Sequence, residues 1–359
     1  MAQGPSVFSR LSKNTLGLLS FAWIVLLAFV AVFAYQLAPD ASKNANQMHL
    51  SIHSQPPGFE VQLLRLPLLG EAEETDFFEG SSIRYDEVPI SDWRFREGRI
   101  EIQPYGRRAS YYEPLDPNRI PPDQDLAEFM DAQVVTQRFI LGTDKYGRDL
   151  LSRLIIGSRV SLAIGFVAVF ISLLIGVVLG AVAGYFGGRV DAAIMGLINI
   201  VWSIPTLLLV IAITLVLGRG FWQVFIAVGL SMWVEVARLV RGLVMGLKER
   251  TFIQAAHTLG FSNGTIIFKH LLPLLVAPLI VLSAANFASA ILIESGLSFL
   301  GIGAQPPIPS WGGMIKDHFR YLLLGKPYLA ILPGLCIMLL VLAFMTLGNS
   351  LRDALDVKN

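Results

Sequence analysis

The chain contains several long runs without a charged residue, and they constrain its fold more than any other feature. The first covers residues 16–37 and would make a helix of roughly 33 Å, enough to cross the hydrocarbon core of a bilayer. Only 15% of all residues are charged, against about a quarter in soluble domains. We therefore predict an all-α polytopic membrane protein with six transmembrane helices, the other five formed by residues 160–188, 192–218, 221–238, 271–293 and 328–347.

Arg10 and Lys13 precede the first run, an arrangement that signal peptides also have. The run is longer than the apolar core of a signal peptide, about 7–15 residues, and no clear A-x-A cleavage site follows it. We therefore predict that residues 16–38 form an uncleaved transmembrane anchor.

Lys and Arg residues in the short loops set the expected orientation of the spans. With the N-terminus inside, the inner segments hold ten of these residues and the short outer segments hold four. This bias predicts that residues 1–15 and the tail 351–359 are cytoplasmic and that residues 39–158 lie on the outer side. Residues 159–350 would then form a five-helix core with a cytoplasmic loop at 249–270.

The polar insert between the first two spans is where most of the charge is concentrated. Residues 38–159 hold 14 basic and 20 acidic residues, and the rest of the chain holds 14 and 7. Alternating polar and apolar residues at 59–66 and 93–103 predict strands, the second pair around a turn at Glu97 and Gly98. The insert should be a small β-containing lobe. His49 and His53 lack an obvious third ligand, so no metal site is expected.

Two features of the spans concern helix packing. Pro205 interrupts the third run and predicts a bend, which either lies beside a cavity or serves packing alone. Small residues at every fourth position of the second run would let a neighbouring backbone approach closely, and they are Ser172, Gly176, Gly180, Gly184 and Gly188.

Several classes of function are excluded by what the sequence lacks. It has no nucleotide-binding loop G-x-x-x-x-G-K-[ST] and no H-E-x-x-H. A net charge of +1 gives no reason to expect nucleic acid as a partner, and the one cysteine, Cys336, cannot form an intrachain disulfide. Glu235 and Glu294 are the acids within the spans, both near the expected span ends. For Glu235 an ion pair with Arg238 is preferred over proton coupling.

The loop between the fourth and fifth spans, residues 249–270, contains the most informative pattern. Phe252, Ala255, Ala256 and Leu259 recur at helical spacing and would share one face of a short amphipathic helix. Gly260 can end that helix in a left-handed conformation, and a second helix can begin at Ser262. We predict a cytoplasmic helix–turn–helix whose alanines let a partner approach closely. The alternative is a helix that lies on the lipid surface.

The same loop resembles the signature of the permease subunits of bacterial ABC importers. That signature reads Glu-Ala-Ala, three residues, Gly, nine residues, Ile, one residue, Leu-Pro. Gln254 takes the place of the usual Glu and His270 that of the usual Ile, whereas the matching residues are Ala255, Ala256, Gly260, Leu272 and Pro273. Residues 39–139 depart from the family, because they are longer than the corresponding loop. Further blocks resemble the second, C-type permeases of dipeptide, oligopeptide and nickel importers, and they cover residues 141–153, 294–303, 306–312 and 347–356.

This resemblance implies a type I ABC importer transmembrane domain in a bacterial inner membrane. The loop would dock on an ATPase subunit, with Gly260 setting the angle between its helices and Ala255 and Ala256 in close contact. The partners would be a second homologous permease, two ATP-binding cassette subunits and an extracytoplasmic solute-binding protein. The chain itself would be non-catalytic and without a cofactor, because ATP and Mg²⁺ bind the partner subunits. Residues that bind the substrate cannot be assigned from the sequence.

Di- or oligopeptides are the cargo that the resemblance favours, and nickel or another small solute is the alternative. A secondary transporter would instead have inverted repeats and acids at the membrane midplane. A membrane-anchored receptor or enzyme would need a catalytic constellation in the insert, which the sequence does not show.

Overall fold

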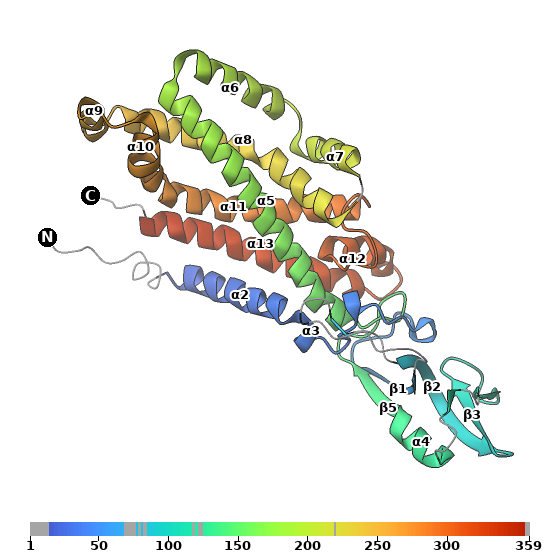
Figure 1. Cartoon of the computed structure of the whole chain (residues 1–359). Coiled ribbons are helices and arrows are strands. Elements are labelled where there is room, and N and C mark those ends of the chain that lie inside the picture. The colour runs from blue at the N-terminus through green and yellow to red at the C-terminus, as the bar shows by residue number, and fades with distance from the viewer. Residues whose placement is uncertain are drawn as a thin grey trace.

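The computed structural model describes residues 14–67, 77, 80–81, 85–116, 119–120, 125–218 and 220–355. A bundle of long helices forms most of the molecule, and a small β-sheet lobe lies at one end of it (Figure 1). Five helices are long and apolar enough to cross a membrane, and they include predicted spans one, two, four, five and six. Their bounds are α2 (Thr15–Val32), α5 (Leu150–Phe186), α8 (Phe221–Lys248), α11 (Leu272–Phe299) and α13 (Tyr328–Leu355).

Helix α5 begins ten residues earlier than the uncharged run suggested. The Asp149 side chain accepts a hydrogen bond from the Ser152 backbone N–H and caps the first turn. Arg153 and Arg159 therefore lie inside the helix, near its N-terminal end. The short helix α3 (Ala34–Leu37) follows α2 after a break at Phe33.

The third predicted span is not one straight helix. It consists of α6 (Gly188–Trp202) and α7 (Thr206–Leu217), which meet at an angle of 91° and count as a sixth span only when taken together. Pro205 explains the break, because it lacks a backbone N–H and disfavours helical geometry in the residue before it. The prediction of a bend at Pro205 is therefore confirmed, and the prediction of a continuous helix is wrong.

The glycine stripe of α5 packs against α8, as predicted. A Cβ atom on Gly176 would lie 2.5 Å from the Val236 Cβ, and one on Gly180 would lie 2.5 Å from the Ala237 carbonyl oxygen. Gly184 faces Arg241 and Val244 in the same way. The residue numbers of α5 and α8 increase in the same direction along this contact, so the two helices run parallel. A Cβ atom on Gly188 would meet nothing within 4 Å, because this glycine belongs to the turn that begins α6.

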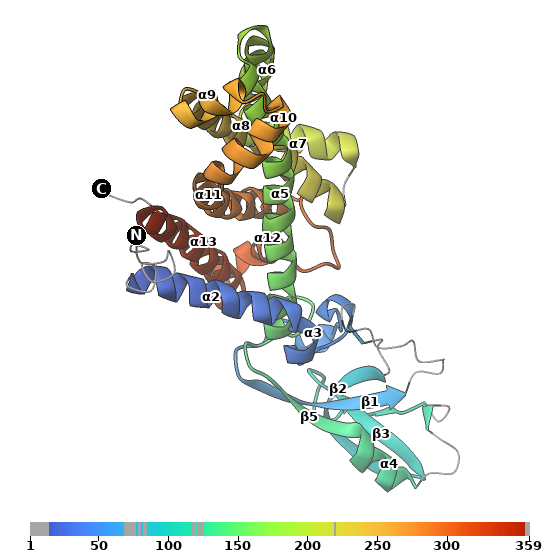
Figure 2. The same cartoon turned by 60° about the vertical axis from the view of Figure 1, so that its left-hand side comes forward.

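The start of α2 and the end of α13 lie at the same end of the bundle. The Asn14 side-chain amide donates a hydrogen bond of 3.1 Å to the Ser350 hydroxyl. Figures 1 and 2 place this end beside α9 (Thr251–Thr258) and α10 (Asn263–Thr265), with the lobe at the opposite end. This arrangement agrees with both chain ends lying on one side of the membrane.

The lobe is an antiparallel sheet with the strand order β4-β3-β2-β1-β5. The predicted strands at 59–66 and 93–103 are confirmed. Within the second stretch, Glu97 and Gly98 form the predicted turn, with φ of 52° and 72°. Helix α4 (Leu126–Gln133) buries Phe129 and Met130 against the sheet. The strands are β1 (Phe59–Pro67), β2 (Tyr85–Arg96), β3 (Arg99–Pro104), β4 (Glu113–Pro114) and β5 (Val134–Phe139).

The lobe is held to the bundle by polar contacts at its base. The Lys326 ammonium donates to the Ser54 carbonyl at 2.7 Å, and the Tyr328 hydroxyl donates to the Gln55 carbonyl at 2.7 Å. Lys145 pairs with Asp317 at 3.0 Å and so joins the lobe's exit segment to α12 (Trp311–His318). The remaining short turns are 3₁₀ helices at Lys43–Ala45, Leu50–Ile52 and Phe319–Leu322.

Candidate functional site

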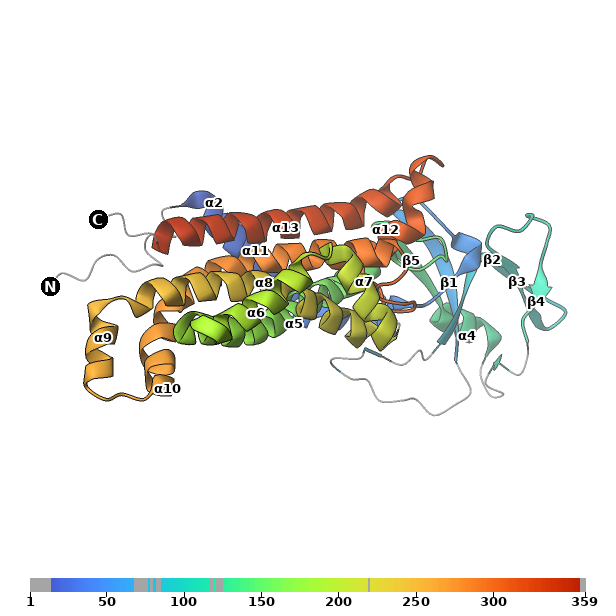
Figure 3. The ribbon, with the colours of Figure 1, turned by 90° about the horizontal axis from the view of Figure 1, so that it is seen from above.

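The loop after α8 folds as the predicted helix–turn–helix. Helix α9 ends before Gly260, whose φ of 80° is the left-handed conformation expected of a helix C-cap glycine. The Ser262 hydroxyl then accepts from the Thr265 backbone N–H and begins α10. A π-helical turn (Ile266–Leu271) leads into α11. Figure 3 shows α9 and α10 projecting from the end of the bundle that lies opposite the sheet.

One residue of the expected docking face lies elsewhere. Phe252 and Leu259 are 47% and 76% exposed, and Ala255 is exposed between them. Ala256 is only 5% exposed and packs inward with Ile253, so the expectation that it shares the outer face is wrong. The sequence alone did not single out Ile253, although it is completely buried and anchors α9 to α8 and α11.

The other loop residues have modest contacts. The Gln254 side chain is exposed, and its amide lies 3.4 Å from the Glu249 carbonyl. The His270 ring is half-buried, 5.7 Å from the Phe261 ring. Pro273 is exposed at the first turn of α11, where a missing N–H costs nothing.

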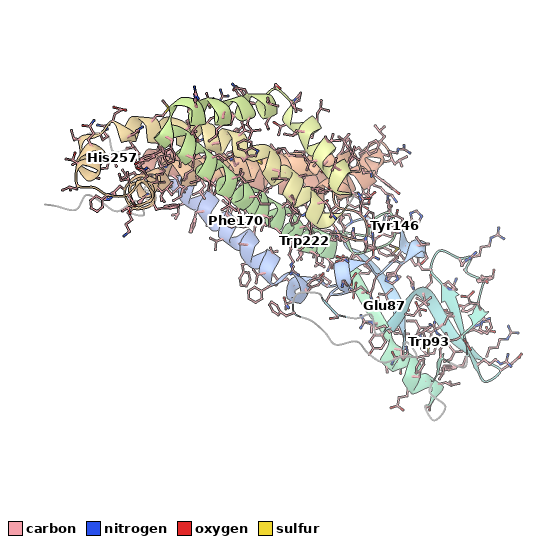
Figure 4. All side chains as sticks on the ribbon, turned by 45° about the horizontal axis from the view of Figure 1, so that its top comes forward. Glu87, Trp93, Tyr146, Phe170, Trp222 and His257 are labelled. Atoms are coloured by element: carbon pink, nitrogen blue, oxygen red, sulfur yellow. The ribbon has the colours of Figure 1, made fainter. Side chains whose placement is uncertain are left out.

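Tyr185, at the end of α5, joins both helices of the loop, and sequence reasoning missed it. Its hydroxyl donates to the Asn263 side-chain oxygen at 2.8 Å and lies 3.1 Å from Nε2 of His257. The Lys248 ammonium donates to the Tyr185 carbonyl at 2.7 Å. Figure 4 shows His257 at the far end of the bundle from the lobe. The available signal was a tyrosine at the end of an apolar helix, because its hydroxyl needs a partner once buried.

A cavity of about 220 Å³ lies beside the break between α6 and α7. Of the two readings of Pro205, the structure supports a bend beside a cavity. Residues of α7, α8 and α11 line it, among them Thr206, Ser231, Glu235 and Ser289. Trp202, the last residue of α6, closes one side.

The predicted ion pair between Glu235 and Arg238 is wrong. The Arg238 guanidinium lies 3.7 Å from the centre of the Trp202 ring. No salt bridge within 4.0 Å joins it to Glu235, and both residues belong to the part of the chain that the structure describes. Glu235 is exposed and lines the cavity.

Glu235 also lies deeper than the sequence suggested. It is 14 residues from the first residue of α8 and 13 from the last. Val236, the next residue along α8, contacts Gly176 near the middle of the uncharged part of α5. Glu235 therefore lies at the same depth. Glu294 lies near the end of α11 as expected, and it is completely buried, with one carboxylate oxygen accepting from the Ser298 hydroxyl at 2.7 Å.

The block at residues 141–153 builds the end of the bundle next to the lobe. The Arg148 guanidinium pairs with the Asp144 carboxylate at 2.6 Å, and both side chains are almost fully buried. Tyr146, Arg148 and Arg153 line a second cavity of about 500 Å³ between the base of the lobe and α12. Figure 4 shows Tyr146 at this junction.

Comparison with known families settles what kind of protein has this architecture. Residues 176–358 match the family described as the binding-protein-dependent transport system inner membrane component, and residues 4–57 match the N-terminal transmembrane domain of oligopeptide transport permease C. The chain belongs to this permease family. The permease is therefore a multi-pass inner-membrane component of an ABC transporter and not itself a catalyst. Membership in a binding-protein-dependent system implies ATPase and binding-protein partners.

Individual relatives agree with this assignment. The permease is 44% identical over 217 residues to the dipeptide transport system permease protein DppC of Alkalihalophilus pseudofirmus, a match over 60% of this chain and 71% of that relative. The glutathione transport system permease protein GsiD of Escherichia coli O157:H7 has the same identity and coverage. Among solved structures, the inward-facing MetNI methionine ABC transporter aligns with a TM-score of 0.47 and 19% identity, over 57% of this chain and 97% of that one.

The prediction of an ABC importer permease is thus confirmed, and the readings as a secondary transporter, receptor or membrane enzyme are set aside. Residues 58–175 of the permease fall between the two matched regions. They include the sheet lobe. Residues 39–57, which the sequence analysis placed in the departing stretch 39–139, lie within the match to the N-terminal domain of permease C.

Proposed function

We propose that this permease carries di- or oligopeptides inward, together with a second homologous permease, two ATP-binding cassette subunits and an extracytoplasmic binding protein. The observation that supports peptide cargo is the 44% identity to permeases named for dipeptides and for glutathione, itself a tripeptide. In this arrangement residues 39–158 are extracytoplasmic, and residues 1–15, 249–270 and 351–359 are cytoplasmic.

The loop 249–270 is proposed as the contact with the ATPase subunit. Phe252, Ala255 and Leu259 form an exposed apolar surface on α9, at the end of the bundle away from the lobe. Apolar side chains exposed together on a short projecting helix are typical of an interaction site. ATP and Mg²⁺ would bind the partner, whose closure moves the loop and the helices attached to it. Gly260 holds the turn, and Gln254 supplies a neutral hydrogen-bonding group at the rim.

Movement of the loop can reach the spans by two routes that the contacts supply. Ile253 and Ala256 pack into the same buried cluster as Val240 and Val244 of α8. Tyr185 links α9 and α10 to the end of α5. Because α5 and α8 are locked by the glycine stripe, the loop and these two helices would move as one body.

A pair of leucine variants tests the docking surface. Leu259→Glu places a charge on the most exposed apolar side chain of the proposed contact, whereas Leu323→Glu makes the same change at a residue that is 93% exposed near the lobe end. We expect the tagged Leu259→Glu permease to reach the membrane but to lose most of its co-purifying ATPase subunit and its peptide-stimulated ATP hydrolysis. Leu323→Glu should retain both. Equal recovery of the ATPase with the two variants would argue against the docking surface, and hydrolysis that no peptide stimulates would argue against peptide cargo.

A further inference from the structure

The cavity at the break between α6 and α7 has an acid whose surroundings give it a specific task. Glu235 lies at the middle of α8, about 20 Å along the helix from either end at 1.5 Å per residue. It is exposed on the surface of this chain. A carboxylate at the membrane midplane is costly in contact with lipid, so this surface must face protein or water. The second permease of the proposed complex is the protein that would cover it, and the transport path is the source of water.

Among the described residues that line the cavity, Glu235 is the one that carries a charge. The other polar side chains on the wall are the hydroxyls of Thr206, Ser231 and Ser289 and the indole of Trp202. The negative C-terminal end of α6 and the positive N-terminal end of α7 meet at the break, so their partial charges offset each other. Arg238, the nearest cation on the same helix, is held 3.7 Å from the Trp202 ring.

We propose that Glu235 binds the α-ammonium group of the peptide as it passes through the permease. This inference rests on the proposed peptide cargo, and it names the residue that binds the N-terminal end of the peptide. An ammonium group has three donors, which one carboxylate and neighbouring hydroxyls can accept. A metal ion fits less well, since it needs several strong ligands, and the described residues contain no group of three or more His, Cys, Asp or Glu side chains that could hold one.

The site must bind weakly enough for the peptide to leave. A single carboxylate in a partly hydrated cavity meets that requirement better than a closed cage of charges, because each further ion pair would slow release. The break at Pro205 contributes by turning α7 through 91° from α6, beside the cavity that the carboxylate lines.

The charge of the cavity can be measured without relying on transport. In the assembled complex in lipid nanodiscs, Cys336→Ser removes the native thiol and Ser289→Cys places one on the cavity wall. The rates of modification by a cationic and by an anionic methanethiosulfonate are compared from the mass shift of this chain. Glu235→Gln should lower the ratio of cationic to anionic rates about tenfold or more, from Coulomb attraction at short range. Glu235→Asp should restore the ratio, and Glu97→Gln, the same change in the lobe, should leave it unaltered.

Protection of the same thiol identifies the occupant. Dialanine should slow modification at a concentration about tenfold lower than Nα-acetyl-dialanine, and Glu235→Gln should remove that difference. A rate ratio that does not respond to Glu235→Gln would overturn the proposal, since it would mean that a partner's cation already neutralises the carboxylate. Equal protection by the two peptides, or protection by neither, would also overturn it. Peptide-stimulated ATP hydrolysis, measured alongside, then tells whether peptide transport itself has failed.

Discussion

Tyr185 is the residue on which the contacts of the loop 249–270 converge. Its hydroxyl contacts His257 of α9 and Asn263 of α10, and its carbonyl accepts from Lys248 at the end of α8. The aromatic ring also stacks on the His257 ring at 6.0 Å. A hydroxyl shared between the two sides of the Gly260 turn fixes the angle at which the loop leaves the spans. If the loop docks on the ATPase as proposed, Tyr185 is a positioning residue for the coupling of ATP hydrolysis to transport.

Removal of that hydroxyl should weaken coupling without preventing folding. Tyr185→Phe keeps the ring and loses two neutral hydrogen bonds, each worth about 1 kcal/mol. We expect transport per ATP hydrolysed to fall roughly two- to tenfold, with the amount of protein in the membrane unchanged. The ratio of uptake to phosphate release in proteoliposomes measures this. Tyr111→Phe, which removes a hydroxyl that contacts Glu113 in the lobe, is the control. An unchanged ratio in Tyr185→Phe would mean that the apolar contacts of Ile253 alone carry the motion.

At the scale of elements, the close contact between α5 and α8 depends on the absence of side chains. Gly180→Ala would bring a Cβ atom to 2.5 Å from the Ala237 carbonyl oxygen, and the backbone of α8 cannot give way cheaply. Overpacking of this kind costs about 1–3 kcal/mol, so the melting temperature of the solubilised complex should fall by roughly 3–10 °C. Gly196→Ala makes the same change on α6, where no atom lies within 4 Å. If both variants melt alike, the stripe does not determine the contact.

The sheet of the lobe contains a buried ionic contact that predicts a dependence on pH. Burial disfavours the charged form of Glu87, but hydrogen bonds from His49 and Arg65 outweigh it and hold the pKa of Glu87 below its ordinary value of 4.5. The ionised Glu87 carboxylate therefore stabilises the folded lobe. This stabilisation is fully present above about pH 4.5 and is lost as the pH falls through the lower pKa of Glu87 in the folded state.

Hydrogen exchange of β1 and β2 can detect this contribution. At neutral pH, Glu87→Gln should speed exchange about tenfold, the value expected for hydrogen bonds to a charged group. The difference from the unaltered chain should shrink as the pH falls below 4.5, because Glu87 then becomes protonated in both folded and unfolded states. Glu60→Gln, at an exposed site on the neighbouring strand β1, should have little effect at any pH. A difference that stayed constant with pH would assign the effect of Glu87 to packing.

The sequence predicted these elements where one local rule decided the outcome. Long uncharged runs located the spans, Gly260 and Ser262 located the loop turn, and alternation located the strands. Three features depended on contacts between distant elements and were missed. Helix α8 continues past Arg241 because the Asp191 carboxylate of α6 neutralises that charge. Glu235 consequently lies at mid-helix, and its presumed partner Arg238 is held by Trp202. Ala256 faces inward because of how α9 docks on α8.

At the scale of the whole molecule, the lobe and the loop lie at opposite ends of one helix bundle (Figure 1). The lobe is tied to one end of the spans through Lys326 and Tyr328, and the loop to the other end through Tyr185. A binding protein that docks at the lobe end and an ATPase that docks at α9 would therefore act on the same helices from the two sides of the membrane. This requires that the lobe be outside and the loop inside.

Accessibility of two introduced thiols decides that orientation. In a Cys336→Ser background, Ser110→Cys lies in an exposed turn of the lobe and Thr258→Cys lies in the exposed part of α9. In right-side-out spheroplasts, a membrane-impermeant maleimide should label the Ser110→Cys permease at once and the Thr258→Cys permease only after lysis. We expect this order of labelling because Lys and Arg are in excess at the loop end. The contact between Asn14 and Ser350 also places the start of the first span and the end of the last span at that same end. Labelling in the reverse order would place the loop outside, where ATP is absent, and would remove the mechanical link between the ATPase and Glu235.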